Sequence, residues 1–192
     1  SRKTLLLVLL PLAAGLASAW PVLDNGFTFD DEILIVNNPY VHDFEHLGDN
    51  LTRDHFYSRS TPDRGMGYYR PLVKLLFMVQ YQLFGASPRG YHAVSLALFL
   101  LCAAWAFLLF CRLGVPAPVA AAAASVFAAN PCQAESVALV ASQADLLSVL
   151  FILASLYCYA GWREGGGKAA LAGALTLAAL SLASKESGVV LV

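Results

Sequence analysis

Three consecutive carboxylates, Asp30, Asp31 and Glu32, follow a short aromatic strip near the start of the chain. The chain is 58% hydrophobic and only 13% charged, so three adjacent acids must either lie in water beside a membrane or line a polar site. A carboxylate in a polar site can act as a general base toward a hydroxyl group, and Asp30 and Asp31 are the candidates for this role. The alternative is a solvated acidic loop with no chemical role.

Further ionisable residues stand at the ends of later apolar runs: Arg70, Glu135, Asp145 and the pair Lys185-Glu186. Arg70 and Lys185 are candidates for binding a phosphate group, because a guanidinium binds it as a planar fork and an ammonium as a point charge. Glu135, Asp145 and Glu186 could orient a substrate or bind its hydroxyl groups. Asp30 and Asp145 could also complete a divalent-metal site, since carboxylate oxygens are ligands for such ions.

Each of these later residues also has an ordinary structural interpretation. Arg70 could anchor an interfacial helix to lipid headgroups, and Lys185-Glu186 could be a hydrated helix end. Glu135 could cap a short helix that starts at Ser136. Asp145 could be the N-cap of the next helix, because an Asp side chain there accepts hydrogen bonds from free N–H groups.

The four histidines are interpreted as structural. The spacing of His42, His46 and His55 matches no zinc-ligand pattern, so we expect loop residues. His92 stands at the start of an apolar run, where a packed or hydrogen-bonded histidine is the more common case.

The composition predicts an all-α polytopic membrane protein. Mean hydropathy is +0.63, and the charged fraction is half of the quarter that is typical of a soluble domain. The net charge of −1 says nothing about nucleic acid, but the sequence has no basic patch, so we expect no nucleic-acid partner. Of the four cysteines only Cys132 lies in a loop, so no disulfide framework is expected.

Five apolar runs are predicted to be transmembrane helices: residues 4–20, 91–111, 115–129, 146–162 and 169–184. The first could instead be a signal peptide, because Arg2-Lys3 precedes it and Ala17-Ser18-Ala19 resembles a cleavage site. The chain has no initiator Met and stops as a further apolar segment begins. We therefore expect residues 1–192 to be the N-terminal fragment of a larger transmembrane domain.

The polar residues between the first two runs are predicted to form one large loop. Residues 24–70 are the only long polar stretch, and we expect short interfacial helices within it, between residues 44 and 57. Residues 71–84 are apolar but shorter than the roughly 20 residues that a span needs. An amphipathic helix lying along the membrane interface is the better interpretation.

The basic residues predict the orientation in the membrane. With Arg2-Lys3 in the cytoplasm and one crossing at each predicted span, the basic residues of the short loops are cytoplasmic as well: Arg112, Arg163 and Lys168. This agrees with the positive-inside rule. All the candidate site residues then share the opposite, extracytoplasmic face. Treating residues 71–84 as a true span would reverse everything downstream.

An ordered set of short motifs runs along nearly the whole chain. They are Phe29-Asp30-Asp31 with Asn37-Asn38-Pro39, Tyr69-Arg70-Pro71-Leu72, Phe84-Gly85 with Pro88 and Tyr91-His92, Asn130-Pro131, Glu135-Ser136-Val137-Ala138, Ala144-Asp145-Leu146-Leu147, and Leu182-Ala183-Ser184-Lys185-Glu186 with Gly188. In these motifs the chain resembles the GT-C class of membrane glycosyltransferases. The resemblance is closest to the TMTC-type (transmembrane and tetratricopeptide-repeat-containing) O-mannosyltransferases and their bacterial relatives.

The resemblance implies a GT-C-like bundle of many transmembrane helices whose large first external loop holds the catalytic aspartate. It implies inverting transfer of a sugar from a polyprenyl- or dolichyl-phosphate donor to a hydroxyl group of a protein or glycan. The site would face the periplasm or the lumen, in a bacterial inner membrane or the endoplasmic reticulum. Asp30 stands where the family has the first acid of its acidic pair, followed by Asp31, and Lys185 resembles the lysine near the donor phosphate.

Two departures from the family pattern concern substrate recognition. The family more often has His-Pro where this chain has Asn130-Pro131, so any role of that histidine is absent. The repeats of TMTC-type proteins are not in these 192 residues, which leaves the acceptor open. Two other classes stay open as well: a transporter or flippase-like protein that binds a phosphate-bearing lipid without chemistry, and a non-catalytic membrane scaffold whose loop binds a protein.

Overall fold

The computed structural model describes residues 4, 6–57 and 67–191, and these residues are mostly helical with no strand among them. The longer helices are α2 (Leu9–Ala19), α4 (Pro71–Phe84), α5 (Pro88–Arg112), α6 (Ala117–Ala129), α8 (Gln143–Arg163) and α9 (Gly167–Ser184). The shorter ones are η1 (Trp20–Asp24), η2 (Glu32–Val36), η3 (Pro39–Val41), η4 (Phe44–His46), α3 (Leu47–Thr52), η5 (Pro131–Gln133), α7 (Ala134–Ala138), η6 (Val140–Ser142) and η7 (Glu186–Leu191). The prediction of an all-α membrane protein is confirmed.

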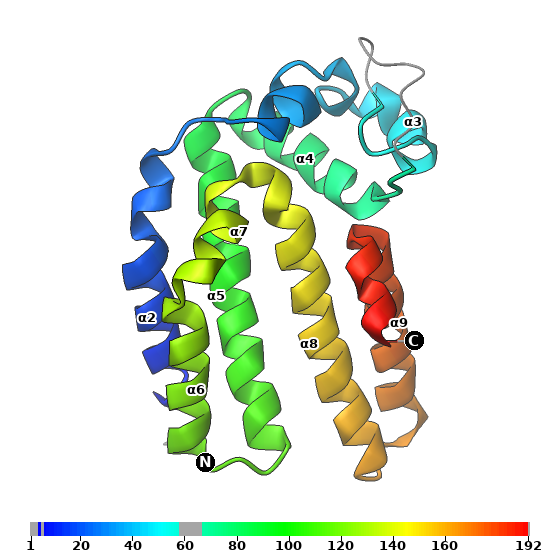
Figure 1. The fold of residues 1–192 in the computed structure, drawn as a ribbon. Helices are drawn as coiled ribbons and strands as arrows, with labels where there is room; N and C mark the ends of the chain where they lie inside the picture. The colour runs from blue at the N-terminus through cyan, green and yellow to red at the C-terminus, as the bar shows by residue number, and fades with distance from the viewer. Residues whose placement is uncertain (1–3, 5, 58–66, 192) are drawn as a thin grey trace.

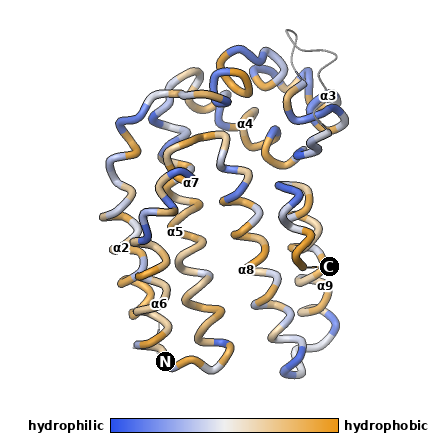
Figure 2. Tube along the Cα trace, in the orientation of Figure 1, coloured by the Kyte–Doolittle hydropathy of each residue, from blue (hydrophilic) through white to orange (hydrophobic). Residues whose placement is uncertain are grey.

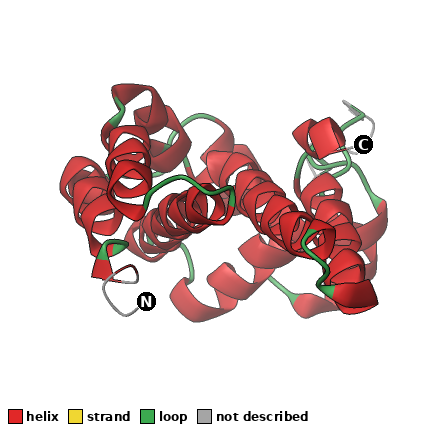
Figure 3. Cartoon of the chain, turned by 90° about the horizontal axis from the view of Figure 1, so that it is seen from below, coloured by secondary structure: helices red, strands yellow, loops and turns green. Residues whose placement is uncertain are grey.

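Five of the long helices form a bundle, and α4 lies across one end of it with the short helices of the polar loop (Figure 1). Hydrophobic residues cover the length of the bundle, whereas hydrophilic residues gather at its two ends and in the loop (Figure 2). The view along the bundle shows helices joined by short connections (Figure 3). This arrangement places every loop that carries candidate site residues at one end.

Among the described residues, three helices are long and apolar enough to cross a membrane: Pro88–Arg112, Val140–Arg163 and Gly167–Ser184. They coincide with the apolar runs at 91–111, 146–162 and 169–184. The runs at 4–20 and 115–129 correspond to shorter apolar helices, Leu9–Asp24 and α6. At 13 residues α6 is about 20 Å long, which is less than the roughly 30 Å hydrocarbon core of a bilayer.

The short apolar helices pack closely against α5. Ala120, Ala121 and Ala124 of α6 are buried against Phe107, and their small side chains let the two helices approach each other. In α2, a Cβ atom at Gly15 would lie 3.0 Å from the Leu100 side chain. Arg2 and Lys3, on which the orientation prediction depends, lie outside the described residues.

The helix α4 begins and ends at the predicted residues, but its polar side chains are not all on a solvated face. Lys74 and Gln80 are both buried. The Lys74 ammonium donates to the Asp54 carbonyl (3.0 Å), and the Gln80 and Gln143 amides donate to each other (2.8 and 3.1 Å). Gln143 also donates to the Ser95 hydroxyl at 3.0 Å. A buried amide needs such partners, so this network joins α4 to α5 and α8.

The polar loop at residues 24–70 contains short helices at the predicted place, η4 and α3. Its residues 58–66 lie outside the described part of the chain. Earlier in the same loop, η2 is a π-helix in which the Asn37 N–H donates to the Glu32 carbonyl (2.7 Å). Single π turns are rare and frequently occur at functional sites, and this one directly follows Asp30 and Asp31.

Candidate active site

A cavity of about 250 Å³ lies between the polar loop and the loop-bearing end of the bundle. Six of the predicted site residues line it: Asp30, Asp31, Arg70, Glu135, Asp145 and Lys185. They come from segments up to 155 positions apart, since the first is residue 30 and the last residue 185. The seventh predicted residue, Glu186, contacts the cavity through its hydrogen bonds to Arg70.

Asp31 is fully buried and holds the polar loop against the bundle. One of its carboxylate oxygens accepts from the Ala141 N–H (2.7 Å), and the other from the N–H groups of Val140 (3.3 Å) and Thr28 (3.2 Å). Burial raises the pKa of the Asp31 carboxyl, while the hydrogen bonds from Ala141, Thr28 and Val140 act to lower it. Both carboxylate oxygens accept hydrogen bonds from backbone N–H groups, so this side chain joins the polar loop to the segment before α8.

Asp30 is exposed to the cavity, and its carboxylate has no hydrogen bond or ion pair within the described residues. The preceding residue, Phe29, has a φ of +50° and is 84% exposed. A positive φ is rare for an aromatic residue, and such strained backbone clusters at functional sites. The strained residue and the π turn together place the adjacent aspartates in different surroundings. The Asp31 side chain is bound by backbone N–H groups, whereas Asp30 is exposed to the cavity.

Lys185 is held by Asp145. The Lys185 ammonium donates to both Asp145 carboxylate oxygens, at 2.6 and 2.7 Å. Lys185 is the extended residue directly after α9, and Asp145 lies in the first turn of α8. The N-cap position of α8 is taken by Ser142, so the N-cap interpretation of Asp145 is wrong.

Arg70 is held by Glu186 in the same manner. Its Nε and Nη2 donate to the two carboxylate oxygens at 2.8–3.2 Å, and its guanidinium lies 4.9 Å from the centre of the Tyr68 ring. Burial acts to raise the pKa of Glu186, but the hydrogen bonds and charge of Arg70 outweigh it, and that pKa is lowered. The Lys185-Glu186 dipeptide therefore joins two ion pairs at the cavity.

Glu135 lies in the first turn of α7 and is exposed to the cavity. Its side chain caps no helix, because α7 begins at Ala134 and its N-cap is Gln133. Within residues 4, 6–57 and 67–191 no group of three or more His, Cys, Asp or Glu side chains is placed to hold a metal ion. The geometry therefore gives the hypothesis of a metal site at Asp30 and Asp145 no support.

Several curated proteins named protein O-mannosyl-transferases are similar to this chain. One from Caenorhabditis elegans is 34% identical over 174 residues, which make up 86% of this chain and 24% of the relative. TMTC4 of Homo sapiens is 33% identical over 188 residues (86% and 25%), and TMTC3 of Mus musculus is 33% identical over 143 residues (74% and 15%).

The chain is similar to TMTC-type proteins over most of its own length. It spans at most about a quarter of the length of these relatives. No family model matches the chain, and no solved structure matches it.

Among the lining residues that were not predicted from the sequence, His55 is the one with a titratable side chain. His55 lines the cavity with only 1% of its surface exposed, and its Nδ1 has no hydrogen-bond partner within the described residues. Burial, together with the charges of Arg70 and Lys74, lowers the pKa of His55 to about 3. The imidazole is therefore neutral at physiological pH and adds no positive charge beside Arg70. The spacing of His55 from the other histidines in the sequence does not indicate that it lines the cavity.

The other histidines are structural, as expected. The His42 ring lies 2.7 Å from the Ile35 carbonyl and stacks on Tyr81, and the His92 ring lies 3.3 Å from the Gly26 carbonyl. His46 lies 3.9 Å from a carboxylate oxygen of Asp49.

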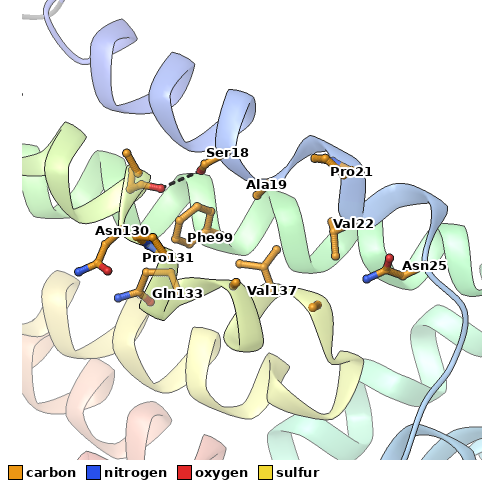
Figure 4. Close-up of a pocket in the computed structure, with 14 residues that line it drawn as sticks. Ser18, Ala19, Pro21, Val22, Asn25, Phe99, Asn130, Pro131, Gln133 and Val137 are labelled. Carbon is orange, nitrogen blue, oxygen red and sulfur yellow. Dashed lines mark hydrogen bonds between the residues drawn. The ribbon is translucent and has the colours of Figure 1, made fainter.

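Asn130, where the family resemblance would place a histidine, lies in a second cavity of about 400 Å³ (Figure 4). Its side chain accepts from the Cys132 N–H at 3.0 Å and so caps η5. Figure 4 shows apolar side chains such as Phe99, Val22 and Val137 around this space, which has no charged residue in its lining. Asn130 thus does not contribute to the cavity that holds the acidic residues.

Proposed function

We propose that the full-length protein is a membrane glycosyltransferase that moves a sugar from a lipid-phosphate donor to a hydroxyl acceptor. The observation that carries this proposal is the unpaired carboxylate of Asp30 in a cavity that also contains Arg70 and Lys185. A group-transfer site of this kind needs a base for the acceptor and cations for the leaving phosphate. Similarity to proteins named protein O-mannosyl-transferases supports mannose as the transferred sugar.

In the proposed reaction, Asp30 accepts the proton of the acceptor hydroxyl. The acceptor oxygen forms a bond to C1 of the sugar while the bond from C1 to the donor phosphate oxygen breaks, with inversion at C1. The electron pair of the broken bond stays on the phosphate, where Arg70 and Lys185 stabilise the negative charge. No other reactant is required.

The two ion pairs serve this reaction by fixing the cations in advance. A free lysine or arginine side chain would lose rotational freedom on binding the phosphate, whereas Asp145 and Glu186 already hold Lys185 and Arg70 in place. The guanidinium Nη1 of Arg70 donates to no group within the described residues and is available to the donor phosphate. Glu135, which lines the cavity and has no ion pair within the described residues, is proposed to bind substrate hydroxyl groups.

We further propose that the donor carries a polyprenyl or dolichyl chain and that the cavity faces the extracytoplasmic side of a multi-pass protein. The positive-inside distribution of Arg112, Arg163 and Lys168 supports this orientation. A reporter enzyme fused after Lys168 in the full-length protein should then score as cytoplasmic. An external score would overturn the orientation.

The acceptor is proposed to be a serine or threonine hydroxyl of a protein, which fits the names of the relatives. The test is to reconstitute the full-length protein in liposomes with dolichyl-phosphate mannose and a serine- and threonine-rich peptide. We expect mannose to appear on the peptide. Transfer to an added glycan instead would change the acceptor class, and no transfer from any lipid-phosphate sugar would overturn the proposed function.

A further inference from the structure

A second polar feature lies at the end of the bundle opposite the acidic cavity. A cleft of about 530 Å³ opens between the last turns of α5 and α8, which are lowest in Figure 1. Leucines 109, 113 and 156 form apolar walls, and two arginines, Arg112 and Arg163, stand at its end. The cleft has no residue in common with the proposed transfer site.

The position of Arg112 in this cleft is built into the helix packing. Its guanidinium donates to the Glu164 carboxylate (2.9 Å) and lies 4.5 Å from the centre of the Tyr157 ring. It also passes so close to α8 that a Cβ atom at Gly161 would lie 2.5 Å from its Nη2. A larger residue at Gly161 would displace the guanidinium from this place, where the contacts with Glu164 and Tyr157 hold it.

Arg163 supplies positive charge that the protein leaves unbalanced. It is exposed and has no ion pair within the part of the chain that the structure describes, whereas the one carboxylate of the lining, Glu164, is already bound to Arg112. The lining therefore carries two guanidinium groups and one carboxylate, a net charge of +1. A group with negative charge would complete it.

The cleft lies at the depth of lipid headgroups. Arg163 is 18 residues beyond Asp145 on α8, which corresponds to about 27 Å along the helix, close to the thickness of a bilayer core. Aromatic side chains surround this end of the bundle: the Tyr159 and Trp162 rings lie 5.6 Å apart, and the Trp105 and Tyr157 rings 5.4 Å apart. Tyrosine and tryptophan concentrate at the membrane interface.

We propose that this cleft binds one anionic phospholipid. The lipid phosphate lies between Arg163 and Arg112, and an acyl chain follows the leucine walls into the bilayer. The net positive charge selects an anionic headgroup, because the ammonium of a zwitterionic lipid would be repelled by the unpaired Arg163. Basic pockets between helices at a membrane interface commonly hold such headgroups.

The test is to purify the full-length protein from a bilayer that contains equal amounts of phosphatidylglycerol and phosphatidylcholine and to count bound lipids by native mass spectrometry. We expect one phosphatidylglycerol to be retained in preference to phosphatidylcholine. R163Q should lower that retention about fivefold, as expected for one basic residue near the headgroup, and R163K should preserve it. A160W, which fills the cleft without removing a charge, should abolish it.

The matched control is K168Q, which removes an exposed positive charge from the first turn of α9, at the same end of the bundle but outside the cleft. K168Q should leave retention unchanged. An equal loss in K168Q and R163Q would show attraction by surface charge alone and would overturn the proposal. Retention that survives A160W would also overturn the proposal. So would equal retention of the two lipids by the wild-type protein, which is expected if another segment of the full-length protein fills the cleft. R163Q changes an exposed residue, so its folding is not at risk.

Discussion

The Lys185 ammonium lies 2.6 and 2.7 Å from the two carboxylate oxygens of Asp145, 40 residues earlier in the chain. This contact joins the end of α9 to the first turn of α8 at the wall of the acidic cavity. Lys185 is followed directly by Glu186, which binds Arg70. One dipeptide thus connects both of the proposed phosphate-binding cations to their carboxylate partners.

We predict that Lys185→Ala lowers the rate of sugar transfer about 10²-fold, comparable to the loss of one group that stabilises a developing anion. Asp145→Asn should have a smaller effect, since the ammonium remains and loses only its anchor. The measurement is kcat and KM for the lipid-phosphate donor in the full-length protein. The double variant should be no worse than Lys185→Ala alone. Fully additive losses would contradict a shared role of the pair.

Asp31→Asn is predicted to destabilise the loop rather than the chemistry alone. In the amide, an NH2 group replaces one of the two carboxylate oxygens that accept from the Ala141, Val140 and Thr28 N–H groups. A donor then faces a donor, which should lower the free energy of unfolding by about 1–3 kcal/mol. Thermal unfolding of the purified full-length protein measures this loss. Glu32→Gln is the matched control, because Glu32 is exposed and outside the cavity. A stable but inactive Asp31→Asn would instead assign the base to Asp31.

His55→Gln is predicted to make stability less sensitive to acid. The pKa of His55 is lowered from 6.5 to about 3 in the folded protein. As the pH falls, the imidazole therefore binds a proton in the unfolded chain at a higher pH than in the folded protein. The stability that depends on the neutral imidazole is fully present above pH 6.5 and is lost as the pH falls from 6.5 toward 3. At pH 5 the loss is about 2 kcal/mol, because one pKa unit corresponds to about 1.4 kcal/mol.

The measurement for His55 is the thermal midpoint of wild type and variant at pH 7.5 and pH 5.0. The wild type should lose more stability between the two values than the variant. His46→Gln serves as control, since His46 is a half-exposed loop residue. An identical acid response of wild type and His55→Gln would show that this histidine is not buried in neutral form.

Gln143→Leu is predicted to destabilise the junction between α4 and the bundle. The change leaves the buried Gln80 amide without its partner, and one unsatisfied buried group costs about 1–3 kcal/mol. The double variant Gln80→Leu with Gln143→Leu removes both members and should be less destabilised than the sum of the single variants. Denaturation of the three variants measures this difference, and strict additivity would contradict a direct contact.

The end of the bundle at which the site lies could be predicted from the sequence. Asp30, Arg70, Asp145 and Lys185 stand next to apolar runs, and the alternation of long runs with polar loops brings such positions to one face. The helix boundaries of α4 followed from Pro71 and Gly85, which can begin and end a helix.

The roles of adjacent residues could not be predicted, because they depend on packing. Asp30 and Asp31 look alike in the sequence, and only the strained Phe29 and the π turn at Glu32 separate a cavity residue from a buried one. The partners of Lys185 and Arg70 depend on how the segment after α9 folds back. Lys74 and Gln80 are buried by contacts with the loop and α8. The sequence pattern of the 14-residue helix α4 gives no information about these contacts.

The measurement that tests the central claim most directly compares donor binding and sugar transfer in Asp30→Asn. The full-length protein is reconstituted in liposomes, and both quantities are measured on the same preparation with a lipid-phosphate mannose donor. Because Asp30 is proposed to act only as the base, donor affinity should stay within about twofold of wild type while the transfer rate falls by about 10²- to 10⁴-fold. Transfer at the wild-type rate in Asp30→Asn would contradict the account.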